Sequence, residues 1–261
     1  MPSLPVEIRA GALAYTLPML AGRRGVRHAF STRHGGVPAG GRLARKRLLQ
    51  GGGFSPDTRI VTLHQVHGAD VLSVMSPVTP PGDPPAADAA VTDVAGTLLV
   101  VQTADCAAIL LADATAGVVA AAHAGWRGAV AGIVAGTLDS MQQMGASPSR
   151  VLAAIGPSLG PCCFEVGEEV AEQFDAIDRS LVDRSRRRPH VDLPAAVTLL
   201  LARSGVPESA IERADACTAC RQDLFFSHRG ERGRSGRMLA SIARTDGRAV
   251  VSSTLAHRTS R

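Results

Sequence analysis

The distribution of apolar residues along the chain predicts short buried strands that alternate with helices. Two apolar runs, Leu98–Gln102 and Val118–Ala122, are bounded by Gly or polar residues, which is typical of buried strands. Each of these runs leads directly into polar residues. Further strands are predicted at Val26–Thr32, Ile60–Leu63, Ala69–Val74, Val151–Ile155, Ile211–Ala214 and Arg237–Ala243.

Helices are predicted where apolar residues recur at helical spacing. The longest is Gly128–Met144, with apolar residues along one face and Gly145 as its stop. Shorter helices are predicted at Arg42–Gln50, Glu168–Phe174 and Asp192–Ser204. Because strands and helices alternate, the pattern indicates the α/β or α+β class in a single domain.

The domain organisation follows from the same pattern. We expect an N-terminal lead-in over residues 1–25, with a short strand or hairpin around Val6–Leu17. The main domain is expected over residues 26–245 and a polar tail over residues 246–261. The Pro- and Gly-rich segment Ser76–Ala87 is expected to be a surface loop, and Asp178–His190 an exposed arginine-rich segment.

Composition changes this picture little. The chain has 261 residues and a net charge of +5, and its pI of about 9.4 raises the question of nucleic-acid binding. Its arginines are scattered, however, and no aromatic residues lie between them to stack on bases, so we expect no nucleic-acid partner. Lys46 is the only lysine, which we interpret as a compositional bias.

The location of the protein is predicted from its apolar runs and its cysteines. The first 30 residues lack the apolar core and cleavage site of a secretory signal, and no uncharged apolar run reaches the roughly 18 residues of a membrane span. Five cysteines are an odd number in a chain that is large enough to fold without disulfides. We therefore expect a cytoplasmic protein with reduced thiols and no membrane partner.

The candidate chemistry lies where the central strands end. Cys106 follows the first run and His123 the second, so the fold could bring a thiol and an imidazole together. Such a pair serves a cysteine nucleophile with its base or a metal site, although buried cysteines are also common in ordinary cores. His67 also follows a strand and would complete three ligands for zinc or copper, with a fourth position left for water.

Four other candidate residues each have a functional and a structural interpretation. Arg33, Arg127 and Arg229 lie in loops with Gly or Ser, where they could bind an anion or remain solvated. Asp105 could orient a ligand, transfer a proton or cap a helix.

The remaining cysteines form two short motifs. Cys217–Cys220 is a CxxC motif, which occurs in zinc sites and redox pairs, but no second CxxC follows, so a non-metal role is favoured. Cys162 and Cys163 are adjacent, which we interpret as poor geometry for sharing one site, and we expect them to be structural.

Seven motifs together resemble one family. They are FSTRHGGV at 30–37, QVHGADV at 65–71, TADC at 103–106, AAHAGWRG at 121–128, AAIGPSLGPCCFEVG at 153–167, CTAC at 217–220 and FFSHRG at 225–230 with GR at 236–237. The chain resembles the YfiH-type laccase-domain family, also described as peptidoglycan editing factors or purine nucleoside phosphorylases of a multicopper polyphenol oxidase-like group. The motifs extend over most of residues 26–243.

The resemblance implies a fold and an activity. It implies a layered α/β/β/α sandwich with mixed sheets, related to cysteine hydrolases, in which Cys106 and His123 form a dyad. It implies zinc, with copper as the alternative, held by His67, Cys106 and His123. The implied reactions are phosphorolysis of adenosine, inosine and methylthioadenosine to the base and ribose 1-phosphate, and deamination of adenosine. Arg33 and Arg127 are then candidates to hold the phosphate, and Arg229 a candidate substrate contact.

The resemblance also leaves alternative functions open, and the chain departs from the usual family sequence at two places. Bacterial members are linked to copper-dependent phenol oxidation and to correct peptidoglycan composition, so an oxidase, a cysteine hydrolase or an accessory protein are the alternatives. Eight histidines without an HxH pair are few for a multicopper enzyme. A pocket-bordering segment of the type SLNLG…GDD…N is missing after Pro38, and His228 replaces the usual tyrosine of FFSYR.

Overall fold

The computed structural model describes residues 13–41, 43, 45–76 and 83–245, and two mixed β-sheets form its centre. The five-stranded sheet has the order β1 (Ala14–Tyr15), β2 (Val26–Ser31), β13 (Met238–Arg244), β6 (Thr97–Thr103) and β3 (Arg59–Thr62). The six-stranded sheet has the order β12 (Ile211–Arg213), β9 (Leu152–Ile155), β7 (Ala107–Asp113), β8 (Val118–Ala124), β5 (Ala89–Thr92) and β4 (Val71–Val74).

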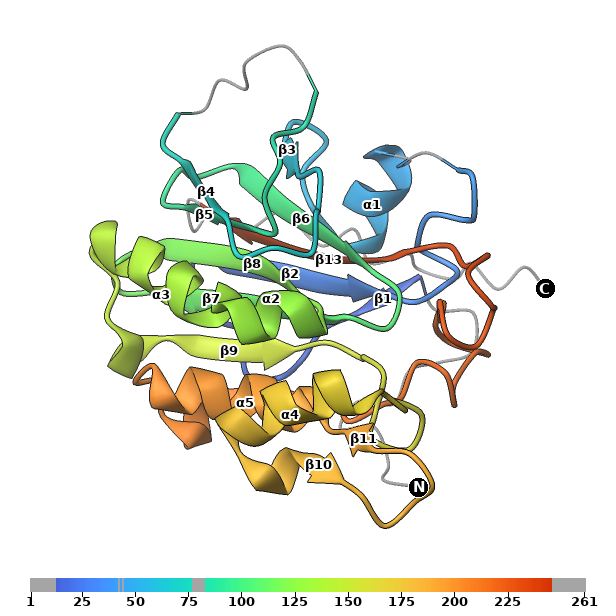
Figure 1. Ribbon diagram of the computed structural model, residues 1–261. Helices are drawn as coiled ribbons and strands as arrows, with labels where there is room; N and C mark the ends of the chain where they lie inside the picture. The colour runs from blue at the N-terminus through green and yellow to red at the C-terminus, as the bar shows by residue number, and fades with distance from the viewer. Residues whose placement is uncertain (1–12, 42, 44, 77–82, 246–261) are drawn as a thin grey trace, which may run out of the picture.

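Five α-helices lie within the described part of the chain, together with a small two-stranded sheet (Figure 1). The helices are α1 (Arg45–Gly51), α2 (Trp126–Ala131), α3 (Ile133–Gln143), α4 (Glu168–Ile177) and α5 (Leu193–Arg203). The small sheet pairs β10 (Val182–Asp183) with β11 (His190–Val191). The structure therefore has the α/β class that the alternation of strands and helices in the sequence predicts.

Apolar side chains on both faces of each sheet hold the layers together. Along β6, Leu99 and Val101 pack between the two sheets, whereas Leu98 and Val100 pack against α1 on the outer face. Along β7, Leu110 faces the five-stranded sheet, and its neighbours Ile109 and Leu111 face the helices α2–α5. Because successive strand residues point to opposite faces, strands covered on both faces are apolar throughout.

The central segment contains one more strand than we predicted. β7 follows Cys106 directly and was missed, because its residues are apolar on both faces and show no alternation with polar positions. β6 belongs to the five-stranded sheet and β7 to the six-stranded sheet, so the chain crosses between the sheets at residues 104–106. Cys106 therefore lies at a crossover and not at the end of an isolated strand.

The long helix predicted over Gly128–Met144 is interrupted. Gly132 adopts a left-handed conformation with φ of +96°, ends α2 and begins α3. Glycine takes this conformation without the steric cost that a side chain would add. The break separates the helix that follows His123 from the helix that covers the sheet.

Register places the two central candidates side by side. In the antiparallel pair β7–β8, Ala107 lies opposite Ala124 and Ala108 opposite His123. Cys106 immediately precedes Ala107, so its thiol lies at the same end of the sheet as the His123 imidazole. Pairing of these strands thus builds the candidate site.

The structure describes only part of the predicted N-terminal lead-in and none of the predicted tail. Residues 1–12 and the tail 246–261 lie outside the described residues, as does much of the expected Val6–Leu17 hairpin. In the segment Asp178–His190, the arginines at 184, 186, 187 and 188 are exposed as expected, but His190 is buried in β11. Among the described helices, none is long and apolar enough to cross a membrane.

Candidate metal and catalytic site

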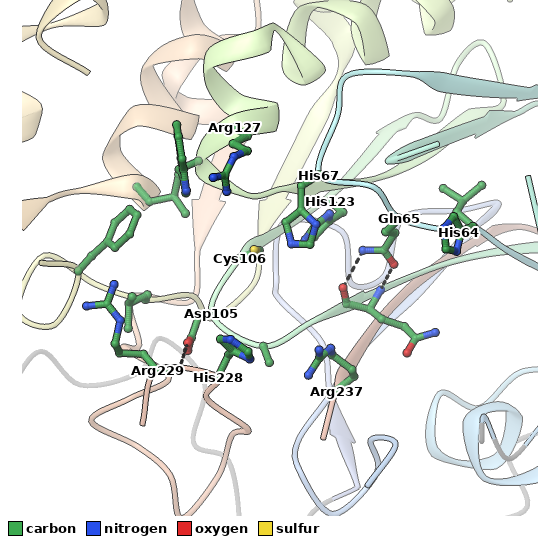
Figure 2. A pocket seen from close by; sticks show the side chains of 17 residues that line it. His64, Gln65, His67, Asp105, Cys106, His123, Arg127, His228, Arg229 and Arg237 are labelled. Atoms are coloured by element: carbon green, nitrogen blue, oxygen red, sulfur yellow. Dashed lines mark hydrogen bonds between the residues drawn. The ribbon is translucent and has the colours of Figure 1, made fainter. Parts of the chain in front are cut away.

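A cavity of about 540 Å³ opens where the β6–β7 crossover meets the C-terminal end of β8. The side chains that line it come from these elements, from the segment between β3 and β4, from the first residues of α2 and α5, and from the loops after β9 and β12 (Figure 2). They include His67, Asp105, Cys106, His123, Trp126, Arg127, Leu159, Phe164, His228, Arg229 and Arg237. Most of the residues that we singled out from the sequence therefore face one cavity.

Three of these residues form the centre of the site. One side-chain atom from each of His67, Cys106 and His123 lies within 4.8 Å of the others. The two imidazole rings lie 4.8 Å apart at an interplanar angle of 81°, and both point toward the thiol (Figure 2). The structure thus brings together the metal-ligand set expected from the sequence.

Asp88 positions two parts of this centre and was missed in the sequence. Its fully buried carboxylate accepts a 2.7 Å hydrogen bond from Nδ1 of His123. The same carboxylate accepts the backbone N–H groups of Val66, His67 and Gly68, at 3.2, 3.0 and 2.7 Å. Asp88 therefore leaves Nε2 of His123 to face the thiol, and it fixes the turn that carries His67.

The electrostatics of the centre favour a thiolate beside an imidazolium. Burial raises the pKa of Cys106, but hydrogen bonds and charge from His123 and His67 outweigh burial and lower it to about 7. Burial lowers the pKa of His123, but Asp88 and Cys106 outweigh this and raise it to about 9. Such a pair offers a nucleophilic sulfur or a ready metal ligand near neutral pH.

Two residues of the site have uncommon backbone conformations. His67 has φ of +60° and Asp105 has φ of +87°, both in the region that glycine prefers. Hydrogen bonds from neighbouring segments hold each residue there, through Asp88 for the first turn and through the loop after β12 for the second. Strain of this kind is typical of functional sites.

Glycines of the HAGWRG motif give the site its close packing. A Cβ atom on Gly125 would lie 3.1 Å from Sγ of Cys106 and 3.2 Å from Cδ2 of His67. A Cβ atom on Gly128 would lie 2.7 Å from the carbonyl oxygen of Gly68. A side chain at either position would therefore displace the candidate ligands.

Asp105 joins the crossover to the C-terminal loops and caps no helix. Its Oδ1 accepts the hydroxyl of Thr218 at 2.6 Å, and its Oδ2 accepts the backbone N–H of Arg229 at 2.6 Å. Its own carbonyl oxygen accepts the N–H of Leu159. Asp105 thus positions Cys106 and the cavity wall, because both of its carboxylate oxygens are engaged.

The candidate arginines differ in where they lie. Arg127 and Arg229 line the cavity, and Arg237, which we missed in the sequence, lines it as well. Within the described residues Arg127 forms no ion pair and its guanidinium lies 4.2 Å from the Trp126 ring centroid. The structure does not bring Arg33 to the cavity, because its guanidinium is paired with Glu231 at 2.9 Å.

Gln65 is a second positioning residue that we missed. Its side-chain amide donates to the carbonyl of Gln102 and accepts the N–H of the same residue, both at 2.8 Å (Figure 2). This paired contact ties the turn that carries His67 to β6. The QVHG motif contained the signal, since a polar side chain next to a candidate ligand is well placed to orient it.

The expectation that two adjacent cysteines have poor geometry for sharing one site is wrong. Both Cys162 Sγ and Cys163 Sγ lie 3.5 Å from Sγ of Cys220. Together with Cys217 they form a second cluster, whose four sulfur atoms all lie within 4.8 Å of one another. The partner of the CxxC motif is the Cys162–Cys163 pair, which lies upstream in the sequence.

The donor set of the first cluster fits a zinc or copper ion. Two imidazoles and one thiolate are ligands for either metal, and three ligands leave a position open toward the cavity. The Asp88–His123 contact is the outer interaction that metal-binding histidines usually make.

Fold and site together define an α/β protein with two mixed sheets and a Cys–His–His centre at one cavity. Residues 39–245 match the family described as multi-copper polyphenol oxidoreductase laccase. The chain belongs to this family, which confirms the resemblance drawn from its motifs.

Relatives with assigned names are similar along most of the chain. A purine nucleoside phosphorylase of Deinococcus radiodurans is 39% identical over 245 residues, which cover 87% of this chain and 92% of that protein. The purine nucleoside phosphorylase YfiH of Escherichia coli is 37% identical over 76% of this chain and 78% of its own length. A protein named adenosine deaminase RL5, from an unknown prokaryotic organism, is 42% identical over 60% of this chain and 62% of its own length.

A solved structure has the same fold. The crystal structure of YlmD from Geobacillus stearothermophilus superposes with a TM-score of 0.80 at 33% identity, and covers 93% of this chain and 99% of that one. The arrangement of two mixed sheets with helices is therefore the fold of this family.

Proposed function

We propose that this protein is a purine nucleoside phosphorylase that also deaminates adenosine, with zinc held by His67, Cys106 and His123. The observation that carries the proposal is the position of these three side chains in a cavity that also presents arginines. The names of the Deinococcus radiodurans and RL5 relatives point to the same two reactions. A cavity of about 540 Å³ has the size expected for a small-molecule ligand.

Zinc, when bound, would supply Lewis acidity and lower the pKa of a coordinated water. Asp88 would keep Nδ1 of His123 occupied, so that only Nε2 faces the centre. Gln65 and Asp88 would hold the His67 turn in place, and Gly125 would leave the space that the ligand atoms need. The chain's own contribution is therefore a preorganised donor set.

In phosphorolysis a phosphate oxygen bonds to C1′ of the ribose while the bond from C1′ to the purine nitrogen breaks. The base leaves with the bonding electrons and takes up a proton, and ribose 1-phosphate is the second product. We assign phosphate binding to Arg127, which lines the cavity and forms no ion pair within the described residues, because guanidinium groups bind phosphate through paired hydrogen bonds. Arg229 and Arg237 are further candidates, although their guanidinium groups already donate to backbone carbonyls. Arg33 then supports the wall through Glu231 and has no direct phosphate contact.

In deamination a water oxygen bonds to C6 of adenine and ammonia leaves, so the product is inosine. This reaction needs no phosphate. Apolar groups from Leu159, Phe164 and Trp126 offer surfaces for the flat base. The two reactions therefore differ in their dependence on the arginines.

The test is a metal-defined assay with adenosine, in the presence and absence of phosphate, with all products separated by chromatography. We expect adenine and ribose 1-phosphate only with phosphate, and inosine under both conditions. Cys106→Ala should abolish both reactions. His67→Ala tests a second ligand, and His34→Ala is its matched control, because His34 is exposed and does not line the cavity. Full turnover in Cys106→Ala would refute the proposal.

A second candidate function uses the same donor set with copper. Two histidines and a cysteine also suit copper, and phenol oxidation would then be a side reaction of this centre. Loading the protein with copper and measuring oxygen uptake with a phenol tests it. Oxidation that exceeds nucleoside turnover would favour the oxidase over the phosphorylase.

The cysteines bear on the compartment. All five lie in the described residues, where they belong to the two candidate metal clusters. Cysteines used as thiols or metal ligands are typical of reducing compartments, so we propose a cytoplasmic location.

A further inference from the structure

Four cysteines gather outside the cavity, from two loops that are far apart in the sequence. Cys162 and Cys163 lie in the loop after β9, and Cys217 and Cys220 lie in the loop after β12. Their four sulfur atoms all lie within 4.8 Å of one another, and none is in a disulfide. No residue of the proposed reaction belongs to this cluster, so it needs an explanation of its own.

The spacing of the sulfur atoms matches a metal site better than a disulfide. In tetrahedral zinc sites the Zn–S distance of about 2.3 Å separates neighbouring sulfur atoms by about 3.8 Å. Two of the distances here are 3.5 Å, whereas a disulfide joins two sulfur atoms at about 2.05 Å and would leave the other two thiols unused. One ion can use all four.

A glycine lets the two loops of the cluster approach each other. A Cβ atom on Gly160 would lie 3.2 Å from Cβ of Cys217 and 3.5 Å from Sγ of Cys162. The cysteines of the two loops can therefore reach a common centre.

Charge and access also suit a metal. Four thiolates with one divalent cation carry a net negative charge, and the guanidinium groups of Arg186 and Arg229 donate to the carbonyls of Cys162 and Cys163 beside them. A cavity of about 530 Å³, lined by Cys162, Cys217 and Cys220, adjoins the cluster. An ion therefore has a route of entry.

We propose that Cys162, Cys163, Cys217 and Cys220 form a structural tetrathiolate zinc site, distinct from the Cys–His–His centre. The site fastens the loop after β9 to the loop after β12. Four protein ligands close the coordination shell, which is the pattern of structural zinc sites. The proposal does not depend on the reaction assigned to the cavity.

Fastening these loops fixes one wall of the cavity. Leu159 and Phe164 flank the first cysteine pair, and Thr218 lies within the second motif. Thr218 donates to Asp105, the residue before Cys106, and Arg229 donates to carbonyls of the first loop. Loss of the ion should therefore loosen the wall and leave the Cys–His–His ligands in place.

The first test measures metal content of the full-length protein, purified under reducing conditions and supplied with zinc. We expect two equivalents of zinc, one for each cluster. Cys106→Ser should lose one equivalent and keep the other. Cys217→Ser with Cys220→Ser should also retain one, and should bind adenosine more weakly because the wall is loosened.

Cobalt substitution identifies the ligands with all four cysteines of the cluster in place. Wild-type protein loaded with cobalt should show the intense visible bands of a tetrahedral ion with four thiolate ligands, and these bands should persist in Cys106→Ser. Wild-type protein that binds a single equivalent of zinc, all of it lost in Cys106→Ser, would overturn the proposal. A disulfide found by mass spectrometry of the freshly alkylated protein, or bound iron with sulfide, would also overturn it.

Discussion

At the scale of single residues, Asp88 has the widest influence on the site. Its carboxylate orients His123 and holds three backbone N–H groups of the turn that carries His67. Burial raises its pKa, but hydrogen bonds from His123 and from this turn outweigh burial, so the pKa lies below its ordinary value. The role of this buried carboxylate is therefore to position its donors, which are the His123 ring and the turn that carries His67.

Asp88→Asn should weaken metal binding. The amide NH₂ group would face N–H donors, so at least one contact to His123 or to the turn is lost. Loss of such an outer contact typically costs about 10- to 100-fold in metal affinity. Competition with a zinc chelator measures this effect. Asp113→Asn is the matched control, because Asp113 is also buried and accepts several N–H groups, but lies away from the site. An equal loss of affinity in both variants would contradict the assigned role.

The Cys106 thiol should titrate near neutral pH in metal-free protein. Burial raises its pKa, but His123 and His67 lower it to about 7. The thiolate fraction, and with it the rate of alkylation by iodoacetamide, therefore rises as the pH rises through about 7. Mass spectrometry of the peptide that contains Cys106 follows this rate. His123→Asn should move the midpoint to higher pH, and an unmoved midpoint would show that the imidazole does not act on the thiol.

At the scale of elements, helix α2 fits against the turn that carries His67 only because of a glycine. Gly128 faces the carbonyl of Gly68, and Gly125 precedes α2 beside Cys106 and His67. The short helix and the turn are therefore one packing unit, and the ligands sit at their contact.

Gly128→Ala should displace the turn and weaken zinc binding. The added Cβ would lie 2.7 Å from a backbone oxygen, a distance that real contacts do not reach. Gly136→Ala in α3 is the control, since its Cβ would find ordinary contacts at 3.6 Å or more. Removal of a helical glycine stabilises by roughly 0.5–1 kcal/mol. The unfolding temperature should therefore rise in Gly136→Ala and fall in Gly128→Ala, whereas zinc affinity should fall in Gly128→Ala and stay unchanged in Gly136→Ala.

Elements with a clear pattern could be predicted from the sequence, and those without one could not. β2, β3, β9 and α5 lie close to their expected positions because flanking turn residues or an apolar face mark them. β7 was hidden because packing on both faces removes its periodicity, and the predicted long helix contained Gly132 without a stop signal around it. The Cys–His–His centre could be predicted because each of its three motifs follows a short apolar run in the sequence.

The parts of the site that were missed depend on contacts across the fold. Asp88 is remote in sequence from His67 and His123, and no local pattern distinguishes it from other buried polar residues. Cys162 and Cys220 meet because β9 and β12 are parallel neighbours, and their spacing in the sequence gives no indication of this. The position of Arg33 outside the cavity could not be predicted, because a loop arginine next to glycines can point to either side of its loop.

At the scale of the whole molecule, three apolar layers separate the two sheets and the helices. His28 is a buried polar group within this arrangement, on β2, where Nε2 accepts the backbone N–H of Leu17. Burial lowers its pKa to about 4, so the folded protein holds it neutral at physiological pH.

Global stability should fall as the pH drops from about 6.5 to about 4. In this range the unfolded chain binds a proton at His28 that the folded chain does not, so protonation favours unfolding. A pKa shift of this size can change the free energy of unfolding by at most about 3 kcal/mol. His28→Gln keeps an acceptor for Leu17 and should flatten the pH dependence of denaturant unfolding in this range. An unchanged slope would show that another group is responsible.

The pairing of β7 with β8 has a consequence for how the protein matures. Cys106 directly precedes β7 and His123 lies at the end of β8, so the pairing of these two neighbouring strands brings both ligands together within the six-stranded sheet. An ion captured by this hairpin would hold its open end closed while the five-stranded sheet docks against it. Refolding should therefore run faster with zinc than without it, and equal rates would show that the ion enters only after the two sheets have docked.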